Sequence, residues 1–150
     1  MARLGWILFL LMTLVASGLA YKFIIKGETE VAPDGRTTLL LNDSERTFFL
    51  NEMRNFLIAV QQINDAIEKD DMPQVVSAAK KVGSGDLAHV PAGLMAKLPL
   101  AVKTMGLSTH KAFDQMAMDA EQLGDKDHTL SQLNQILPTC TACHALFKVR

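Results

Sequence analysis

Several residue types are scarce in this chain of 150 residues. Lysine and arginine are balanced by acidic residues, for a net charge of −1, and form no cluster, which argues against a nucleic-acid binder with a basic face. A single tryptophan, a single tyrosine and few runs of valine, isoleucine and threonine favour helices over a sheet. Only two cysteines are present, so a zinc site would need histidine ligands as well. The length predicts one domain with its own core.

The N-terminal segment is apolar, in contrast to the rest of the chain. Residues 4–21, LGWILFLLMTLVASGLAY, carry no charge, and the apolar letters resume after Lys22. Such a run can cross a bilayer as a helix. Gly18 and Ala20 would also suit the cleavage site of a signal peptide, but the run is longer than the usual signal core. Residues 1–26 are therefore predicted to be a membrane anchor, with a signal peptide as the alternative, and in both cases the remainder is exported.

Residues 27–42 are predicted to be a tether between this segment and the domain. They contain Pro33 and the turn-like pair Asp34–Gly35. A short extended apolar piece at 39–41 is expected to pack on the domain. The domain itself is predicted to occupy residues 43–150.

Four amphipathic helices are predicted in this domain. The first begins near Asp43 or Ser44, either of which can cap it, and the second opens with Pro73. The third runs from about 108 to 123, and the fourth starts near 127. The predicted inward positions are Phe49, Leu50, Met53, Phe56, Leu57, Val60, Ile63 and Ile67, then Val75, Val76, Ala79 and Val82, then Phe113, Ala117 and Ala120, and finally Leu130, Leu133, Leu137, Cys140, His144 and Phe147.

The connection from Gly83 to Gly106 contains further glycines and prolines, so we expect an irregular segment with a turn or two of helix around 94–98. No strand is predicted. An all-α, antiparallel four-helix bundle behind a single N-terminal transmembrane helix is then the simplest way to bury the four apolar stripes.

The two cysteines lie three apart in the segment CTACH, residues 140–144. A disulfide between them would close a very small loop and leave the histidine unexplained. A zinc site would have to recruit His89, His110 or His128, none of which has a paired ligand spacing. A redox dithiol belongs at the start of a helix that follows a strand, where the helix dipole lowers the thiol pKa, whereas this pair lies late in the last helix.

Covalent attachment of one haem c explains the motif better than a disulfide, a zinc site or a redox dithiol. Cys140 and Cys143 supply the thiols for two thioether bonds, and His144 supplies an imidazole for the iron from the same short segment. The attachment is made outside the cytoplasm in bacteria, in agreement with an exported chain. We therefore expect the domain on the periplasmic side of the bacterial inner membrane, with the N-terminus in the cytoplasm if the anchor is retained.

A C-terminal CxxCH on the last helix of a four-helix bundle resembles the class II c-type cytochromes, the cytochrome c-prime family. The resemblance covers roughly residues 43–150 and is specific at CTACH, with softer support from ERTFFLNEMRNFL and LSTHKAFDQMAMDA. In that family the first helix covers the opposite face of the haem. A methionine there gives a six-coordinate electron carrier, and an apolar side chain that cannot ligate gives a five-coordinate form that responds to gases.

The position in this chain that matches is Met53, in LNEMRNF, so the resemblance implies Met53 as the distal iron ligand. The alternative is core filler, which is what most buried methionines are. His110 is a rival ligand on the apolar face of the third helix, although a buried histidine bonded to a backbone carbonyl or a haem propionate is the commoner arrangement. Pro138 is expected to kink or restart the last helix.

Haem propionates usually need cationic or donor partners, and each candidate in this chain could equally be an ordinary solvated charge. The candidates are Arg46, Arg54, Lys148 and Arg150.

The resemblance implies a membrane-anchored, monohaem electron carrier that exchanges electrons with redox proteins in or at the same membrane. Two alternatives stay open: a protein that binds nitric oxide or carbon monoxide, and a haem-containing accessory subunit of a membrane complex. Family bundles often pair through their helices, so a homodimer is possible. The sequence offers no inward carboxylate pair and no general base over an open iron, so we expect no enzymatic activity.

Overall fold

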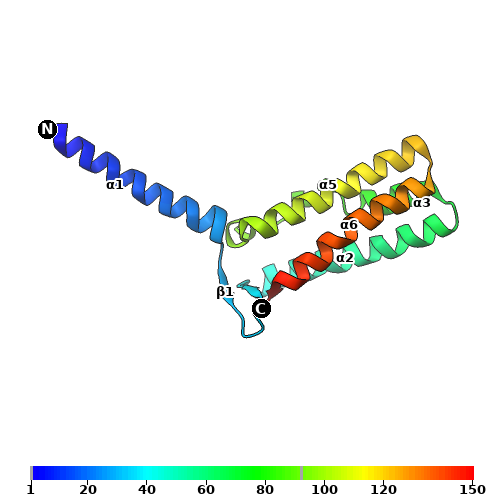
Figure 1. Cartoon of the computed structure of the whole chain (residues 1–150), viewed down its shortest axis with the longest axis horizontal. Coiled ribbons are helices and arrows are strands. Elements are labelled where there is room, and N and C mark those ends of the chain that lie inside the picture. Colours follow the sequence, from blue (N-terminus) through cyan, green and yellow to red (C-terminus); the bar gives the residue numbers. More distant parts are fainter. Residues whose placement is uncertain (1, 92) are drawn as a thin grey trace.

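The computed structural model describes residues 2–91 and 93–150, most of which are helical. The elements are α1 (Ala2–Ala20), η1 (Tyr21–Lys26), β1 (Thr29–Val31), β2 (Thr37–Leu39), α2 (Asp43–Glu68), α3 (Met72–Lys80), η2 (Ser84–His89), α4 (Leu94–Lys97), α5 (Leu100–Leu123), α6 (Lys126–Leu146) and β3 (Phe147–Val149). In Figure 1, α1 projects from a domain in which the long helices α2, α5 and α6 lie side by side.

The N-terminal helix continues from α1 into η1. Together Arg3–Lys26 form a helix of 24 residues that is long and apolar enough to cross a membrane, and its most apolar stretch is not buried in the protein. At about 1.5 Å per residue this helix extends ~36 Å, slightly more than the ~30 Å hydrocarbon core of a bilayer. The predicted apolar N-terminal helix is confirmed.

The junction between this helix and the domain is tightly packed. Gly27 has a φ of +67°, in the left-handed region, and a Cβ there would overlap the carbonyl oxygen of Lys97. Glu28 donates its backbone N–H to that same oxygen over 2.7 Å. Lys103 Nζ donates to the carbonyl oxygens of Phe23 and Ile24, at 2.9 and 3.2 Å, which satisfies acceptors near the end of the helix. The helix is thus attached to the domain through backbone contacts.

Residues 27–42, the predicted tether, contribute two strands to a small sheet. β1 and β2 pair antiparallel, with Val31 opposite Thr37, and β2 pairs in parallel with β3, with Thr37 opposite Phe147. Leu39 is buried, so the expectation that this apolar piece packs on the domain is confirmed. The expectation of no strand was wrong, because a three-residue strand whose partner lies at the opposite end of the domain sequence leaves no local pattern.

The four predicted helices of the domain are present as α2, α3, α5 and α6. The cap of α2 is Asn42, and neither Asp43 nor Ser44. The Asn42 side chain accepts from the backbone N–H of Glu45, and the Glu45 carboxylate accepts from the backbone N–H of Asn42, each over 2.9 Å. This reciprocal pair is a capping box, which satisfies two donors that a helix start otherwise leaves open.

α5 and α6 are longer and more regular than predicted. α5 begins at Leu100, well before the predicted start, and contains Gly106, which was expected to interrupt the helix. A glycine costs about 1 kcal/mol in a helix interior, and burial of the residues around it exceeds that cost. α6 runs through Pro138 without a restart, and the Thr141 hydroxyl donates to the Pro138 carbonyl oxygen over 3.0 Å.

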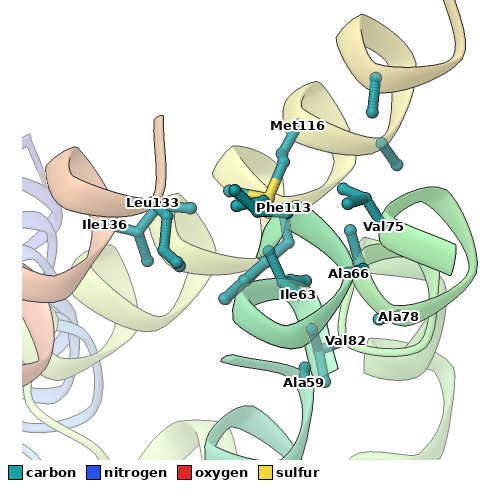
Figure 2. Close-up of a cluster of buried hydrophobic side chains, with 14 of the residues drawn as sticks. Ala59, Ile63, Ala66, Val75, Ala78, Val82, Phe113, Met116, Leu133 and Ile136 are labelled. Atoms are coloured by element: carbon teal, nitrogen blue, oxygen red, sulfur yellow. The ribbon is translucent and has the colours of Figure 1, made fainter. Parts of the chain in front are cut away.

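The helices pack pairwise, α3 against α2 and α5, α5 against α6, and α6 against α2. α3 has nine residues, so it covers α2 and α5 only at the end of the domain far from α1 (Figure 1). At that end the side chains close into a core, which we call the far core and which Figure 2 shows. Its buried members are Ala59, Ile63, Ala66, Ile67, Met72, Val75, Ala78, Ala79, Val82, Phe113, Met116, Ala117, Ala120, Leu133 and Ile136.

A smaller core lies at the end of the domain next to α1, where the sheet, α4 and the first turn of α5 meet. We call it the near core, and its buried members are Leu39, Leu94, Leu98 and Val102. Beside it, Lys97 Nζ donates over 2.8 Å to Glu45 Oε2, and the Glu45 side chain is 5% exposed. This partly buried ion pair joins α4 to the start of α2.

The predicted inward positions become less buried from the far core towards α1. On α2, Ile63 and Ile67 are buried, whereas Met53 and Phe56 are half-buried. Leu57 and Leu130 are exposed, so their inward assignment was wrong, because both lie at the edge of the apolar stripe. The following predicted positions are buried: Val75, Ala79, Val82, Phe113, Ala117, Ala120 and Leu133.

Candidate functional site

A cavity of about 580 Å³ lies between the far core and the near core. Its volume is within the range of about 300–1,000 Å³ that is typical of small-molecule sites. Phe56, Val60 and Leu137 belong to its far side, and Leu94 and Leu98 to its near side. The walls come from α2, α4, α5, α6 and the connection that precedes α4, and most of the lining side chains are apolar.

Cys140, Cys143 and His144 lie near the C-terminal end of α6, and all three line this cavity. Spacings of three and four residues bring them onto one face of the helix. The two cysteines are half-buried free thiols. His144 is exposed, so it lies at the rim of the cavity and not on a buried stripe as predicted.

Burial raises the pKa of both thiols, and for Cys143 the charge of Cys140 adds to that effect. Such thiols stay protonated near neutral pH, whereas a nucleophilic or redox-active dithiol needs a lowered pKa. The pair also lies at the C-terminal end of a helix, where the helix dipole opposes a thiolate. These properties argue against a redox dithiol.

Met53 lines the same cavity from α2, where it is half-buried. Met95 and Met105 line it as well, from α4 and α5, and the sequence pattern had not singled them out. A thioether is uncharged and only a weak acceptor, so all three can face apolar neighbours. The cavity therefore brings Met53 together with the residues of CTACH and places two further sulfur atoms around them.

His110 lines the cavity and is 6% exposed. Its Nδ1 lies 2.8 Å from the carbonyl oxygen of Val82. Since a carbonyl can only accept, Nδ1 carries a proton and donates it in this hydrogen bond. The ring lies 4.9 Å from Phe56 between centroids, and Phe56 stacks on Phe113 at 5.6 Å. His110 therefore makes the expected bond to a backbone carbonyl, within an aromatic stack that runs from the cavity wall into the far core.

A zinc-type cluster is not found in the described part of the chain, because no three side chains of His, Cys, Asp or Glu are placed to hold one ion. His89 and His128 are exposed. His128 Nε2 lies 3.5 Å from Asp119 Oδ2, and neither residue lines the cavity. The histidines that a zinc site would have needed are thus dispersed.

Three acidic or basic side chains besides the histidines line the cavity, those of Glu52, Arg54 and Lys103. Arg54 is the only predicted propionate partner among them. The other three candidates do not line the cavity: Arg46, Lys148 and Arg150. Lys103 was missed because the third helix was predicted to begin after it.

The β1–β2 hairpin contacts the C-terminal end of α6. Arg36 donates from Nε and Nη2 to Asp34 Oδ2, over 3.1 and 2.9 Å, and from Nη1 to the carbonyl oxygen of His144 over 3.5 Å. Lys148 Nζ donates to the same Asp34 oxygen over 3.2 Å. The hydrogen bonds from Arg36 lower the pKa of Asp34 to about 2. An ionised Asp34 thus joins the hairpin to the strand that follows CTACH.

Comparison of the chain with known protein families, with characterised proteins and with solved structures finds no match. The functional argument therefore depends on the CTACH motif and on the geometry of the cavity around it.

Proposed function

We propose that the protein is a c-type cytochrome that binds one haem c covalently in this cavity. Cys140 and Cys143 would form the two thioether bonds, His144 would ligate the iron from the same segment, and Met53 would ligate it from α2. One observation carries the proposal. These four side chains come from opposite ends of the domain sequence, and they line a single apolar cavity.

The chemistry of the cavity suits a haem. Apolar walls would exclude water from a porphyrin, and the few cationic side chains, Arg54 and Lys103, could bind its propionates. The raised pKa values keep both thiols neutral before attachment. The hydrogen bond from His110 Nδ1 to the carbonyl oxygen of Val82 gives one ring nitrogen a partner at the apolar wall.

Within this class we propose the class II type, the cytochrome c-prime family. The support is the position of CTACH on the last helix and of Met53 on the first long helix of the domain. α2, α3, α5 and α6 would then be the four-helix bundle of that family, with a short second helix and an added hairpin. We place the domain on the periplasmic side of the bacterial inner membrane, with α1 as its anchor, since haem c is attached outside the cytoplasm.

We propose electron transfer, without enzymatic activity, as the role of the site. The haem would supply a one-electron centre. The chain would hold the two proposed iron ligands, His144 and Met53, on packed helices, keep water out and limit the change of the site between oxidation states. Redox proteins in or at the same membrane would be the partners, and anchoring would raise their effective concentration.

The test is the optical spectrum of the full-length protein produced together with a bacterial haem-attachment system. We expect haem that stays on the chain after denaturation, a low-spin spectrum with a sulfur-to-iron band, and no response to carbon monoxide. Met53→Ala should lose the sulfur band. Met95→Ala is the matched control, because Met95 lines the same cavity from α4 and should leave the band in place.

The outcomes separate the competing functions. A chain without covalent haem would overturn the whole proposal. The double variant Cys140→Ala/Cys143→Ala gives the reference spectrum of a chain that cannot attach haem. A high-spin spectrum that shifts with carbon monoxide would support haem binding, but it would indicate gas binding as the function in place of electron transfer. If the sulfur-to-iron band survives in Met53→Ala, another methionine of the cavity is the iron ligand.

A further inference from the structure

The turn between α4 and α5 lies directly at the end of the membrane-length helix. Gly27 packs on the backbone of residues 97–99 with no space for a side chain, and Lys103 donates to the carbonyl oxygens of Phe23 and Ile24. These contacts fix the turn relative to the helix. The helix exceeds the hydrocarbon core by about 6 Å, so a helix that spans the bilayer carries this turn into the headgroup layer.

The side chains around the turn suit that layer. Leu100 is 42% exposed and Met95 is 39% exposed, although both are apolar. Lys22 and Lys26 are exposed close by, on the last turns of the helix. Apolar side chains beside lysines are typical of segments that lie in a membrane interface, where the apolar groups reach the acyl chains and the ammonium groups reach the phosphates.

The same segment forms one wall of the cavity, because Met95, Leu98, Val102 and Lys103 all line it. We propose that α4 and the first turn of α5 rest in the phospholipid headgroup layer of the bilayer that α1 crosses, so that the cavity lies at the membrane surface. The proposal rests on the proposed anchoring by α1. It narrows the redox partner to a protein whose electron-exchanging surface also lies at headgroup level.

Fluorescence quenching by lipid tests this placement, since the chain has a single tryptophan, Trp6. In a Trp6→Phe background, Leu100→Trp puts a reporter on the turn. Leu123→Trp is the matched control, because Leu123 is 61% exposed and ends α5 on the side away from α1. Full-length protein is reconstituted into nanodiscs whose lipids are brominated near the headgroup end of the acyl chains, and into unbrominated discs. Both kinds of disc receive the same protein preparation, so the ratio of the two signals compares the lipids at one haem content.

We expect brominated lipid to remove most of the fluorescence of the Leu100→Trp variant and little of that of Leu123→Trp. Thr104→Trp, at an exposed position one turn further along α5, gives a second reporter if Leu100→Trp folds poorly. Equal quenching at the turn and at the control position would overturn the placement. The readout does not use the haem spectrum, so a failure here is distinguishable from a failure of the cytochrome proposal.

Discussion

The two ends of the domain differ in how their interior is filled. In the far core α2, α3, α5 and α6 meet, and Ile63, Val75 and Met116 have no exposed surface. Towards α1, α3 has ended and a cavity of about 580 Å³ remains. Protein interiors have few voids larger than a water molecule, so a cavity of that size marks where side chains stop filling the interior. The far end is closely packed, whereas the end towards α1 has space for the proposed haem.

The largest loss of stability should follow from truncating a side chain in the far core. Phe113 is 1% exposed, and Phe113→Ala should lower the free energy of unfolding by about 3–5 kcal/mol, because a large cavity replaces a packed ring. Chemical denaturation followed by circular dichroism measures it. The control is Leu57→Ala, at the cavity and 69% exposed, which should change stability by less than about 0.5 kcal/mol. Similar losses of unfolding free energy for Phe113→Ala and Leu57→Ala would contradict the difference in packing between the two ends of the domain.

Removing the proposed haem should lower local stability only at the end of the domain next to α1. The double variant Cys140→Ala/Cys143→Ala cannot attach haem, which leaves the cavity without its proposed filling. We expect the amide protons of α4 and of the first turns of α5 to exchange at least about tenfold faster than in the loaded protein, equal to ~1.4 kcal/mol of local stability. Amides of α3 should not change. Hydrogen exchange read by mass spectrometry checks both regions, and a uniform increase would show that the domain opens as one unit.

The helices could be predicted from the sequence because apolar spacing is local information. On α2 the stripe that ends in Ile63 and Ile67 was correct, whereas the start was placed on the wrong cap. The signal for the right cap was present, since Glu45 lies three residues after Asn42 and completes a capping box. Gly106 was over-interpreted as a helix breaker, because tertiary packing outweighs a single weak residue.

Some residues that line the cavity could be singled out from the sequence, whereas most of its walls could not. Met53 was found from a resemblance and the residues of CTACH from their spacing, and the structure brings them to one cavity. The expected turn of helix around 94–98 is present as α4, but its role as a wall of the cavity was not predicted, because the segment around it is rich in glycine and proline. Its apolar residues Leu87, Val90 and Leu94 were the available signal. The sheet left no such signal in the sequence, because the parallel pairing of β2 with β3 is set by the arrangement of the whole domain.

The partly buried ion pair of the near end should have an intermediate effect. Lys97→Met leaves the Glu45 carboxylate, whose side chain is 5% exposed, without its charged partner. We expect a loss of about 2 kcal/mol in unfolding free energy, less than the ~3–5 kcal/mol of a fully buried pair because Lys97 is 25% exposed. Denaturant unfolding measures it. A loss as small as that of an exposed surface pair would mean that water reaches Glu45.

The same pair predicts how stability depends on pH. Burial alone would raise the pKa of Glu45, but hydrogen bonds from Lys97 Nζ and from the N–H of Asn42, with the charge of Lys97, outweigh it, and the net pKa lies below its usual value. Because the folded state lowers the pKa, the stabilisation is complete above the unfolded value and is lost as the pH falls through the folded one. Glu45→Gln should remove this acid dependence. Unfolding curves at a series of acidic pH values compare it with the unchanged chain.

The smallest effect should come from Arg36, which reaches the carbonyl oxygen of His144 from the hairpin. Its ion pair with Asp34 is exposed, with side chains 39% and 42% accessible, so Arg36→Met should change stability by less than ~1 kcal/mol. Loss of a cation near the proposed iron ligand favours the ferric state, so the midpoint potential should fall.

Asp34→Asn is the matched variant for this measurement, because it removes the partner charge of the same pair. If Arg36 acts through its charge, the two substitutions shift the midpoint potential in opposite directions. If it acts by holding the last turn of α6, both weaken the contact between hairpin and helix and shift the potential in the same direction, since Asp34 is what orients Arg36. A redox titration of the two variants thus decides whether the hairpin tunes the near end by electrostatics or by the placement of His144.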